Sequence, residues 1–303
     1  MKTFTKKART FAFIARVLAE KSRLSLQALI SPELAASHAE KLFSSPPRYP
    51  RPYPENKVLQ TGQAFTVHTP QGPIQAWRWG QTEKLIGLVH GWAGRGGQYH
   101  AWIAPLLKAG FSVITYDAPS HGESPGERSS LPELTWALRE VQKQTGPWAA
   151  VVGHSLGAAA VLAGLDQGLQ AEKAILLAPP ADTPRMIRLF GNRMGLKPQV
   201  QSALISKIEN RLGIRLEEFS LPEMASRRTE KALIFHDLDD REVNWGSGER
   251  LSQAWPNAEL ISSKGLGHNR ILRAEQIISP AIEFLTNQPL PGPISPAMHL
   301  LLA

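Results

Sequence analysis

Short apolar runs alternate with helical stretches between residues 85 and 285, and this alternation limits the possible folds more than any other feature of the chain. The runs are continuously apolar, so the strands they predict are buried on both faces, as in a parallel sheet covered by helices. Two earlier runs flank a turn and predict an antiparallel hairpin at the start of the sheet. We therefore predict an α/β fold with a mostly parallel sheet of about eight strands and helices on both faces. The expected strands are Gln63–His68, Ile74–Trp79, Leu85–His90, Phe111–Asp117, Ala149–Gly153, Ala174–Ala178, Ala232–His236 and Ala258–Ser262.

Segments of different character follow one another along the chain. Residues 1–54 form an arm with helical periodicity that ends in a proline-rich stretch. Residues 55–180 and 229–287 carry the predicted strands and form the core. Residues 181–228 contain helical stretches but no strand-like run, so we expect a helical insertion that caps the sheet. Residues 288–303 show no pattern and are interpreted as a tail.

Most of the net positive charge lies at one end of the chain. The sequence holds 34 Lys and Arg against 26 Asp and Glu, and residues 1–51 alone hold ten Lys or Arg and three Glu. A protein that binds nucleic acid needs a basic face on its folded domain. Because the excess charge of this chain lies in the first 51 residues and the rest is almost neutral, we expect no nucleic-acid partner. The absence of cysteine excludes a thiolate nucleophile, a disulfide scaffold and Cys-ligated metal sites.

The first forty residues are basic and amphipathic. Phe11, Ile14 and Leu18 share one helical face, which predicts one or two helices before an extended connector at Ser44–Pro54. We interpret the helices as docking on the body of the protein. A peripheral membrane contact is the less favoured alternative, because bulky apolar anchors are few. Arg16 ends the first apolar run too early for a signal peptide, and no run has the length of a membrane span, so we expect a cytoplasmic protein.

The segment Gly153-His154-Ser155-Leu156-Gly157 stands between a predicted apolar strand and an alanine-rich helix. A serine on a sharp strand-to-helix turn projects its hydroxyl beyond the sheet, and side chains two residues to either side would collide, which explains both glycines. The context therefore predicts a nucleophile elbow with Ser155 as the nucleophile. The N–H of Leu156, at the start of the helix, would face the negative charge that develops on a substrate oxygen.

A serine hydroxyl needs a base and a carboxylate that orients the base. His268 lies in a loop after the last predicted strand, and three aspartates, Asp237, Asp239 and Asp240, follow the strand before it. The order Ser, Asp, His is the one expected for an elbow serine on an α/β sheet. Spacing alone does not separate the neighbouring aspartates. We expect no metal there, since no further ligand at suitable spacing completes a site.

In these motifs the chain resembles the α/β-hydrolase-fold serine hydrolases of the esterase and lipase type, from about residue 63 to residue 285. The resemblance rests on His90-Gly91-Trp92, on Asp117–Ser124, on the elbow, and on the acid and histidine loops. Ser120 departs from the family pattern, which commonly has glycine there.

The resemblance implies an α/β-hydrolase fold and assigns roles to particular residues. Asp240, four residues after His236, is the implied acid, with Asp239 as the alternative. The backbone N–H of Trp92 is implied to complete an oxyanion hole with that of Leu156.

The motifs and the resemblance together predict a carboxylesterase-like hydrolase that cleaves a small-molecule ester through an acyl-enzyme intermediate, without metal or organic cofactor. The alternatives are thioester, amide or carbon–carbon bond hydrolysis or perhydrolysis on the same triad, and a binding protein that keeps the fold without turnover. His121 and His154 are expected to serve in hydrogen bonding and packing rather than in catalysis.

Overall fold

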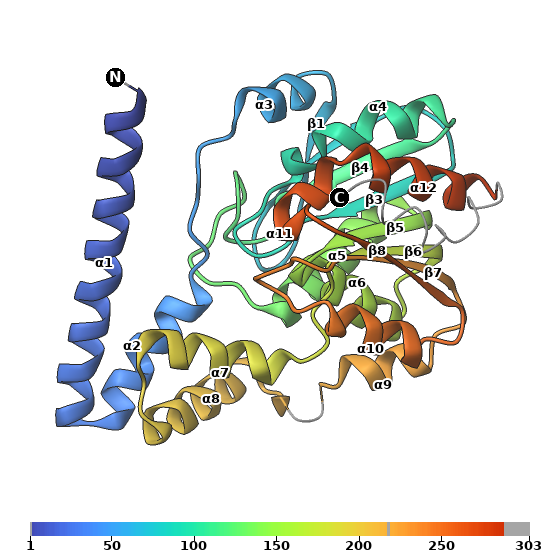
Figure 1. The fold of residues 1–303 in the computed structure, drawn as a ribbon. Coiled ribbons are helices and arrows are strands. Elements are labelled where there is room, and N and C mark those ends of the chain that lie inside the picture. The colour runs from blue at the N-terminus through green and yellow to red at the C-terminus, as the bar shows by residue number, and fades with distance from the viewer. Residues whose placement is uncertain (1, 217–218, 288–303) are drawn as a thin grey trace. The chain divides into compact units, whose positions relative to one another are not determined.

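The computed structural model describes residues 2–216 and 219–287, and the described chain forms one eight-stranded sheet (Figure 1). The strand order is β1-β2-β4-β3-β5-β6-β7-β8. β2 pairs antiparallel with β1 and with β4, and every other pair is parallel, which confirms the predicted mostly parallel sheet. The strands span Gln63–Val67 (β1), Ile74–Trp79 (β2), Leu85–Val89 (β3), Ser112–Tyr116 (β4), Trp148–His154 (β5), Ala171–Leu177 (β6), Lys231–Asp237 (β7) and Ala258–Ser263 (β8).

The direction in which strands are added reverses at β3, because β4 lies on one side of it and β5 on the other. Loops that leave the carboxyl ends of two such strands diverge, and open α/β sheets bind ligands at this point. The loop after β3 carries Gly91 and the turn after β5 carries Ser155. The topology therefore brings the two predicted oxyanion-hole segments to one edge of the sheet.

Helices cover both faces of the sheet (Figure 1). On one face, α4 (His100–Lys108) and α12 (Glu275–Thr286) contribute Trp102 and Ile277 to the buried core. On the other face, α6 (Leu156–Asp166) contacts β5 and α5 (Leu131–Thr145), and its alanines and glycines allow a close approach. The sheet and these helices form one compact unit, residues 46–181 and 221–303, which also contains α3, described below, α9 (Leu221–Ser226), α10 (Gly246–Ala254), α11 (Gly267–Arg270) and the short 3₁₀ turns at Gly96–Tyr99 and Ile271–Arg273.

A second compact unit is made of two segments that are far apart in sequence, residues 1–45 and 182–220. It contains α1 (Lys2–Ile30), α2 (Pro32–Ser44), α7 (Thr183–Met194) and α8 (Pro198–Leu212). Its apolar core includes Leu24 and Ala35, Ala36 and Ala39 from the first segment and Ile187, Val200, Leu204 and Ile208 from the second. The helices of the first segment and of the insertion thus share one core. The role of this unit as a cap stays a prediction.

The region around the proline-rich stretch is partly helical. The extended connector ends at Pro52, and α3 (Tyr53–Leu59) follows it directly. A proline in the first turn is compatible with a helix, because its missing N–H would have no intrahelical partner there. The prediction of an extended chain over Ser44–Pro54 was therefore wrong for Ser44, which ends α2, and for the last two residues, which begin α3. The predicted tail, residues 288–303, lies outside the described residues.

Candidate active site

The turn between β5 and α6 holds Ser155 in a strained backbone conformation, with φ 53° and ψ −124°. The flanking glycines allow this turn. A Cβ on Gly153 would lie 2.6 Å from Cα of Ala158, and a Cβ on Gly157 would collide with the carbonyl oxygens of His90 and Val89. These contacts are with backbone atoms, which cannot rotate away. The structure thus gives a local reason for both glycines of the motif.

The hydroxyl of Ser155 lies at one end of a chain of hydrogen bonds. Its Oγ is 2.9 Å from Nε2 of His268, and Nδ1 of the same imidazole is 2.7 Å from Oδ2 of Asp240. Asp240 follows β7 and His268 follows β8, two neighbouring parallel strands whose carboxyl ends face the same edge of the sheet as the end of β5. The structure therefore brings together three side chains separated by up to 113 positions in sequence.

Asp240 is held as a carboxylate by several donors. Burial by itself would raise its pKa, but the ring of His236, whose Nε2 lies 3.6 Å from Oδ2, and the hydrogen bonds from His268 and from the N–H of Val243 outweigh burial and hold the pKa well below its ordinary value. Its Oδ1 accepts the backbone N–H groups of Glu242 and Val243 at 2.8 and 2.9 Å. One oxygen is therefore bound to the loop, and the other faces His268.

The two other aspartates of the cluster have different partners. Oδ2 of Asp239 accepts the N–H of Gly265 at 3.0 Å. Oδ2 of Asp237 accepts the N–H of Leu266 and the hydroxyl of Ser263. Both carboxylates thus fasten the loop that precedes His268. No group of three or more potential metal ligands occurs among the described residues.

The predicted oxyanion segment lies against the elbow. An added Cβ on Gly91 would be 2.8 Å from the carbonyl oxygen of His154 and 2.9 Å from Cβ of Ser155. Trp92 follows Gly91 directly, and Ala93 turns the chain with a φ of 55°. Leu156 begins α6 on the other side of Ser155. The backbone N–H groups of both predicted donors therefore belong to segments that meet at the serine.

Comparison with known proteins supports the same family. A sequence model described as the Alpha/beta hydrolase family matches residues 88–268, which is more than half of the chain. The chain belongs to the alpha/beta hydrolase family. This confirms the resemblance and the fold class inferred from the motifs.

This α/β hydrolase is 31% identical over 104 residues to a "Probable serine hydrolase" of Drosophila melanogaster; the match covers 32% of the chain and 31% of that protein. A putative lipase from Acinetobacter baumannii has a similar structure, with a TM-score of 0.61, 19% identity, and coverage of 79% of this chain and 98% of that one. A bromoperoxidase from Bacillus anthracis gives a TM-score of 0.56 at 18% identity and covers 75% and 100%. These two structures show the fold alone.

Two buried histidines of the hydrolase support the site without joining the hydrogen-bonded chain. His154 donates from Nε2 to the carbonyl oxygen of His268 at 2.9 Å, and burial lowers its pKa to about 3. His90 donates from Nδ1 to the carbonyl oxygen of Gly91 and accepts the N–H of Ala118 at Nε2. Burial lowers the pKa of His90 to about 4, so both rings are neutral near pH 7. His90 thus links the oxyanion segment to the loop after β4.

The loop after β4 packs on the oxyanion segment. The ring of His121 stands edge-on to Trp92 with centroids 5.6 Å apart, and its Nδ1 donates to the carbonyl oxygen of Pro119. Burial lowers the pKa of His121 to about 3. Ser120, at the family's glycine position, has a φ of 68°, a region that favours glycine, and its hydroxyl donates to the carbonyl oxygen of Arg128. The hydroxyl contact holds a conformation that glycine would adopt without strain.

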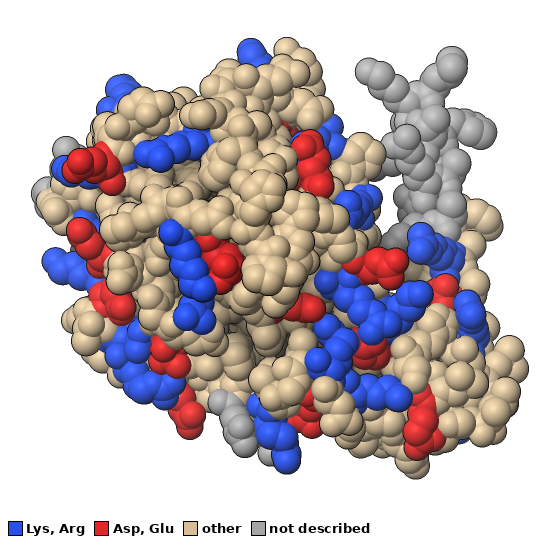
Figure 2. All heavy atoms as spheres, turned by 180° about the vertical axis from the view of Figure 1, so that it is seen from behind, with Lys and Arg blue, Asp and Glu red and all other residues tan. Residues whose placement is uncertain are grey.

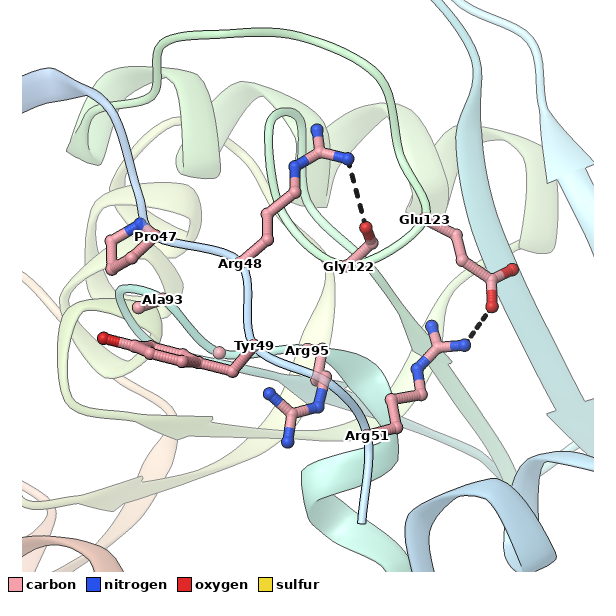
Figure 3. A pocket seen from close by; sticks show the side chains of 9 residues that line it. Pro47, Arg48, Tyr49, Arg51, Ala93, Arg95, Gly122 and Glu123 are labelled. Carbon is pink, nitrogen blue, oxygen red and sulfur yellow. Dashed lines mark hydrogen bonds and ion pairs between the residues drawn. The ribbon is translucent and has the colours of Figure 1, made fainter. Parts of the chain in front are cut away.

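Sequence reasoning did not find the arginines of the connector, which hold this loop from outside (Figure 3). Arg51 forms ion pairs with Glu123 and with the fully buried Asp117, the latter at 2.6 Å. Asp117 also accepts the N–H of Gly96 at 2.8 Å. Arg48 donates to three backbone carbonyls of the same loop, at Gly122, Ser124 and Gly126. The connector is therefore fastened to the loop that packs on Trp92.

A cavity of about 140 Å³ lies between the connector, the segment Ala93–Arg95 and the loop after β4 (Figure 3). Its three arginines all have partners. Arg95 forms two hydrogen bonds with Glu55 of α3, Arg51 pairs with two carboxylates, and Arg48 donates to three backbone carbonyls. Since these partners neutralise or occupy the guanidinium groups, the arginines brace the surrounding loops and do not form an anion site.

Proposed function

We propose that this hydrolase cleaves carboxylic esters with Ser155 as nucleophile, His268 as general base and acid, and Asp240 as the group that orients His268. The observation that carries the proposal is the continuous pair of hydrogen bonds from Ser155 Oγ through His268 to Asp240, at 2.9 and 2.7 Å. A base within hydrogen-bond distance of the nucleophile, itself oriented by a third group, is the arrangement that activates a serine.

In the first half of the proposed reaction, Ser155 Oγ attacks the carbonyl carbon and its proton passes to Nε2 of His268. The negative charge that forms on the carbonyl oxygen is stabilised by the N–H groups of Trp92 and Leu156. When the tetrahedral intermediate collapses, the bond to the leaving oxygen breaks, and Nε2 gives its proton to the departing alcohol. The acyl group remains on Ser155 as an ester.

In the second half, water takes the place of the alcohol. His268 removes a proton from the water, whose oxygen attacks the acyl carbon. The intermediate then releases the carboxylic acid, and the proton returns through Nε2 to Ser155 Oγ. Asp240 stays ionised throughout, because its pKa lies far below neutrality, and it therefore stabilises the imidazolium that forms twice in each cycle.

The choice of ester substrates comes from the comparison with known structures, whereas the choice of nucleophile comes from the geometry of the site. Ester substrates are supported by the lipase among the similar structures. Thioester, amide and carbon–carbon bond hydrolysis and perhydrolysis would use the same three side chains, so a series of ester substrates tests ester cleavage against these alternatives as a group.

The test compares the wild-type protein with the Ser155→Ala variant on p-nitrophenyl esters from acetate to palmitate, with fluorophosphonate labelling in parallel. We expect ester turnover and labelling in the wild type, and a fall in kcat of about 10⁶-fold with loss of labelling in the variant. The control is Ser252→Ala on α10, where the hydroxyl contacts only the local carbonyl of Glu249 in the described structure.

The outcomes separate the alternatives. Labelling without turnover on any ester would overturn the ester proposal and leave a serine hydrolase of another class. Neither labelling nor turnover would overturn the catalytic proposal and support a binding protein. Full turnover by the Ser155→Ala variant would show that the serine is not the nucleophile.

A further inference from the structure

The first helix of the second unit carries an apolar stripe that its own unit does not cover. Of the described side chains of α1, Leu24 alone is buried, and it packs with the alanines of α2. Phe11 and Leu29 are each 76% exposed, and Ile14, Leu18 and Leu26 are exposed as well. Burying a leucine side chain stabilises a protein by about 1.5–3 kcal/mol relative to leaving it in water. Five exposed apolar side chains on one helix therefore point to an interaction surface.

The exposed residues share one side of the helix. At about 100° per residue, Phe11, Ile14 and Leu18 lie within an arc of about 60°. Leu29 is 18 residues, or about five full turns, beyond Phe11 and so returns to the same side. Leu24 lies about 140° away from Phe11 around the axis. The helix thus contacts its own unit with one side and presents a separate apolar side, which from Phe11 to Leu29 extends over about 27 Å.

The charge of the same helix indicates what the stripe contacts. Residues 1–30 contain seven Lys or Arg and one Glu. The glutamate, Glu20, is 3.1 Å from Nε2 of His38 in α2. Among the described basic residues, Arg16 and Arg23 are exposed and Lys21 is half-buried. Lys and Arg side chains also gather over this unit on the face shown in Figure 2.

An apolar stripe with this excess of positive charge fits one partner better than others. Two copies of the helix that packed stripe to stripe would bring their basic residues together, and like charges would oppose the association. A nucleic acid would neutralise the basic residues but would leave the apolar stripe in water. An anionic lipid surface accepts both features, because the apolar side enters the acyl boundary and the basic side chains reach the headgroups.

We propose that α1 binds the surface of anionic membranes and lies along it with Phe11, Ile14, Leu18, Leu26 and Leu29 in the acyl boundary. The sequence alone favours docking of these helices on the body of the protein. The structure adds that α1 contributes Leu24 to the core of its own unit and that the stripe residues take no part in that core. The proposal does not depend on the esterase activity.

The test is co-sedimentation of the full chain with vesicles of phosphatidylcholine alone or with phosphatidylglycerol added. The variants are Leu18→Glu and Leu29→Glu, and the matched control is Leu107→Glu, an exposed leucine on α4 of the other unit. We expect binding to the phosphatidylglycerol vesicles, weakened about tenfold or more by each stripe variant and unchanged in the control. We also expect weaker binding as salt is raised, because the headgroup contacts are screened.

Several results would overturn the proposal. One is no binding of the wild type to anionic vesicles, and another is equal binding of the stripe variants and the control. Sedimentation velocity without lipid tests the competing occupant: a dimer that Leu18→Glu abolishes would show that a second copy covers the stripe. Circular dichroism, expected to be equal in all four proteins, shows whether each variant is folded.

Discussion

Replacing Asp240 with asparagine exchanges one carboxylate oxygen for an NH₂ group. We expect this exchange to move the proton of the neutral His268 ring from Nδ1 to Nε2. Oδ1 of Asp240 accepts two backbone N–H groups, those of Glu242 and Val243. An asparagine must keep its oxygen there, because the opposite orientation would direct its NH₂ group at two donors. The NH₂ group then faces Nδ1 of His268, which becomes an acceptor, and Nε2 becomes the protonated nitrogen. A protonated Nε2 cannot accept the proton of Ser155.

The wrong tautomer of a catalytic histidine costs about 10⁴-fold in kcat, or about 5.4 kcal/mol of barrier height. We expect a loss of this size for Asp240→Asn in initial rates on a p-nitrophenyl ester that the wild type cleaves. The matched control is Asp239→Asn, one residue away, whose Oδ2 accepts the N–H of Gly265. We expect its kcat to change by less than about tenfold, since the loss of one loop hydrogen bond is worth about 0.5–1.5 kcal/mol. The opposite ranking of the two variants would refute the assignment of the acid.

Three further predictions concern stability and are measured by urea unfolding. Gly157→Ala should cost about 1–3 kcal/mol, because its Cβ would collide with carbonyl oxygens of the loop after β3; an unchanged midpoint would contradict the packing described for the elbow. Arg51→Ala should cost about 3 kcal/mol by leaving the buried carboxylate of Asp117 without its counter-charge, whereas Arg250→Ala, at an exposed arginine, should cost less than about 0.5 kcal/mol; equal losses would contradict this role of the ion pair. Stability should fall as the pH is lowered from 6.5 towards 4, by up to about 1.4 kcal/mol per pH unit for each buried histidine, since the unfolded chain binds protons that the folded chain excludes. Burial lowers the pKa of His90 to about 4 and the pKa of His121 and of His154 to about 3. A stability that does not change between pH 7 and pH 5 would contradict the neutral state of these three rings.

Local patterns allowed the sheet to be predicted. Leu85–Val89 is buried throughout, and its continuous apolar sequence indicates this position directly; Ser112–Tyr116 is buried as well, and its apolar residues outweigh Ser112 and Thr115. The elbow was predictable for a similar reason, since the need for Gly153 and Gly157 arises from contacts within one turn and its immediate surroundings. The choice of Asp240 came from the resemblance, and its contact with His268 in the structure agrees with that choice.

Contacts between distant residues left no such pattern. Arg51 and Asp117 are 66 positions apart, and neither has a neighbour in sequence that indicates the other. In the sequence Arg51 appears only as part of a basic arm. Glu55 and Arg95, 40 positions apart, pair for reasons that appear only when α3 packs beside the segment after β3. Short ion pairs of this kind have no periodicity, and the three-dimensional arrangement alone reveals them.

The second unit also has a consequence for synthesis. Its core joins Leu24 and Ala36 to Leu204 and Ile208, so the buried side chains of α1 and α2 leave the ribosome long before the residues of the insertion that complete their core. At about 5–20 residues per second, the delay between residue 45 and residue 216 is roughly 10–30 s. During that interval strands β1 to β6 are synthesised, and the first two helices lack the partners of their core. We expect that a chaperone bound to the nascent chain protects these helices, and that a chimera receiving the insertion of a homologue also needs its first 45 residues.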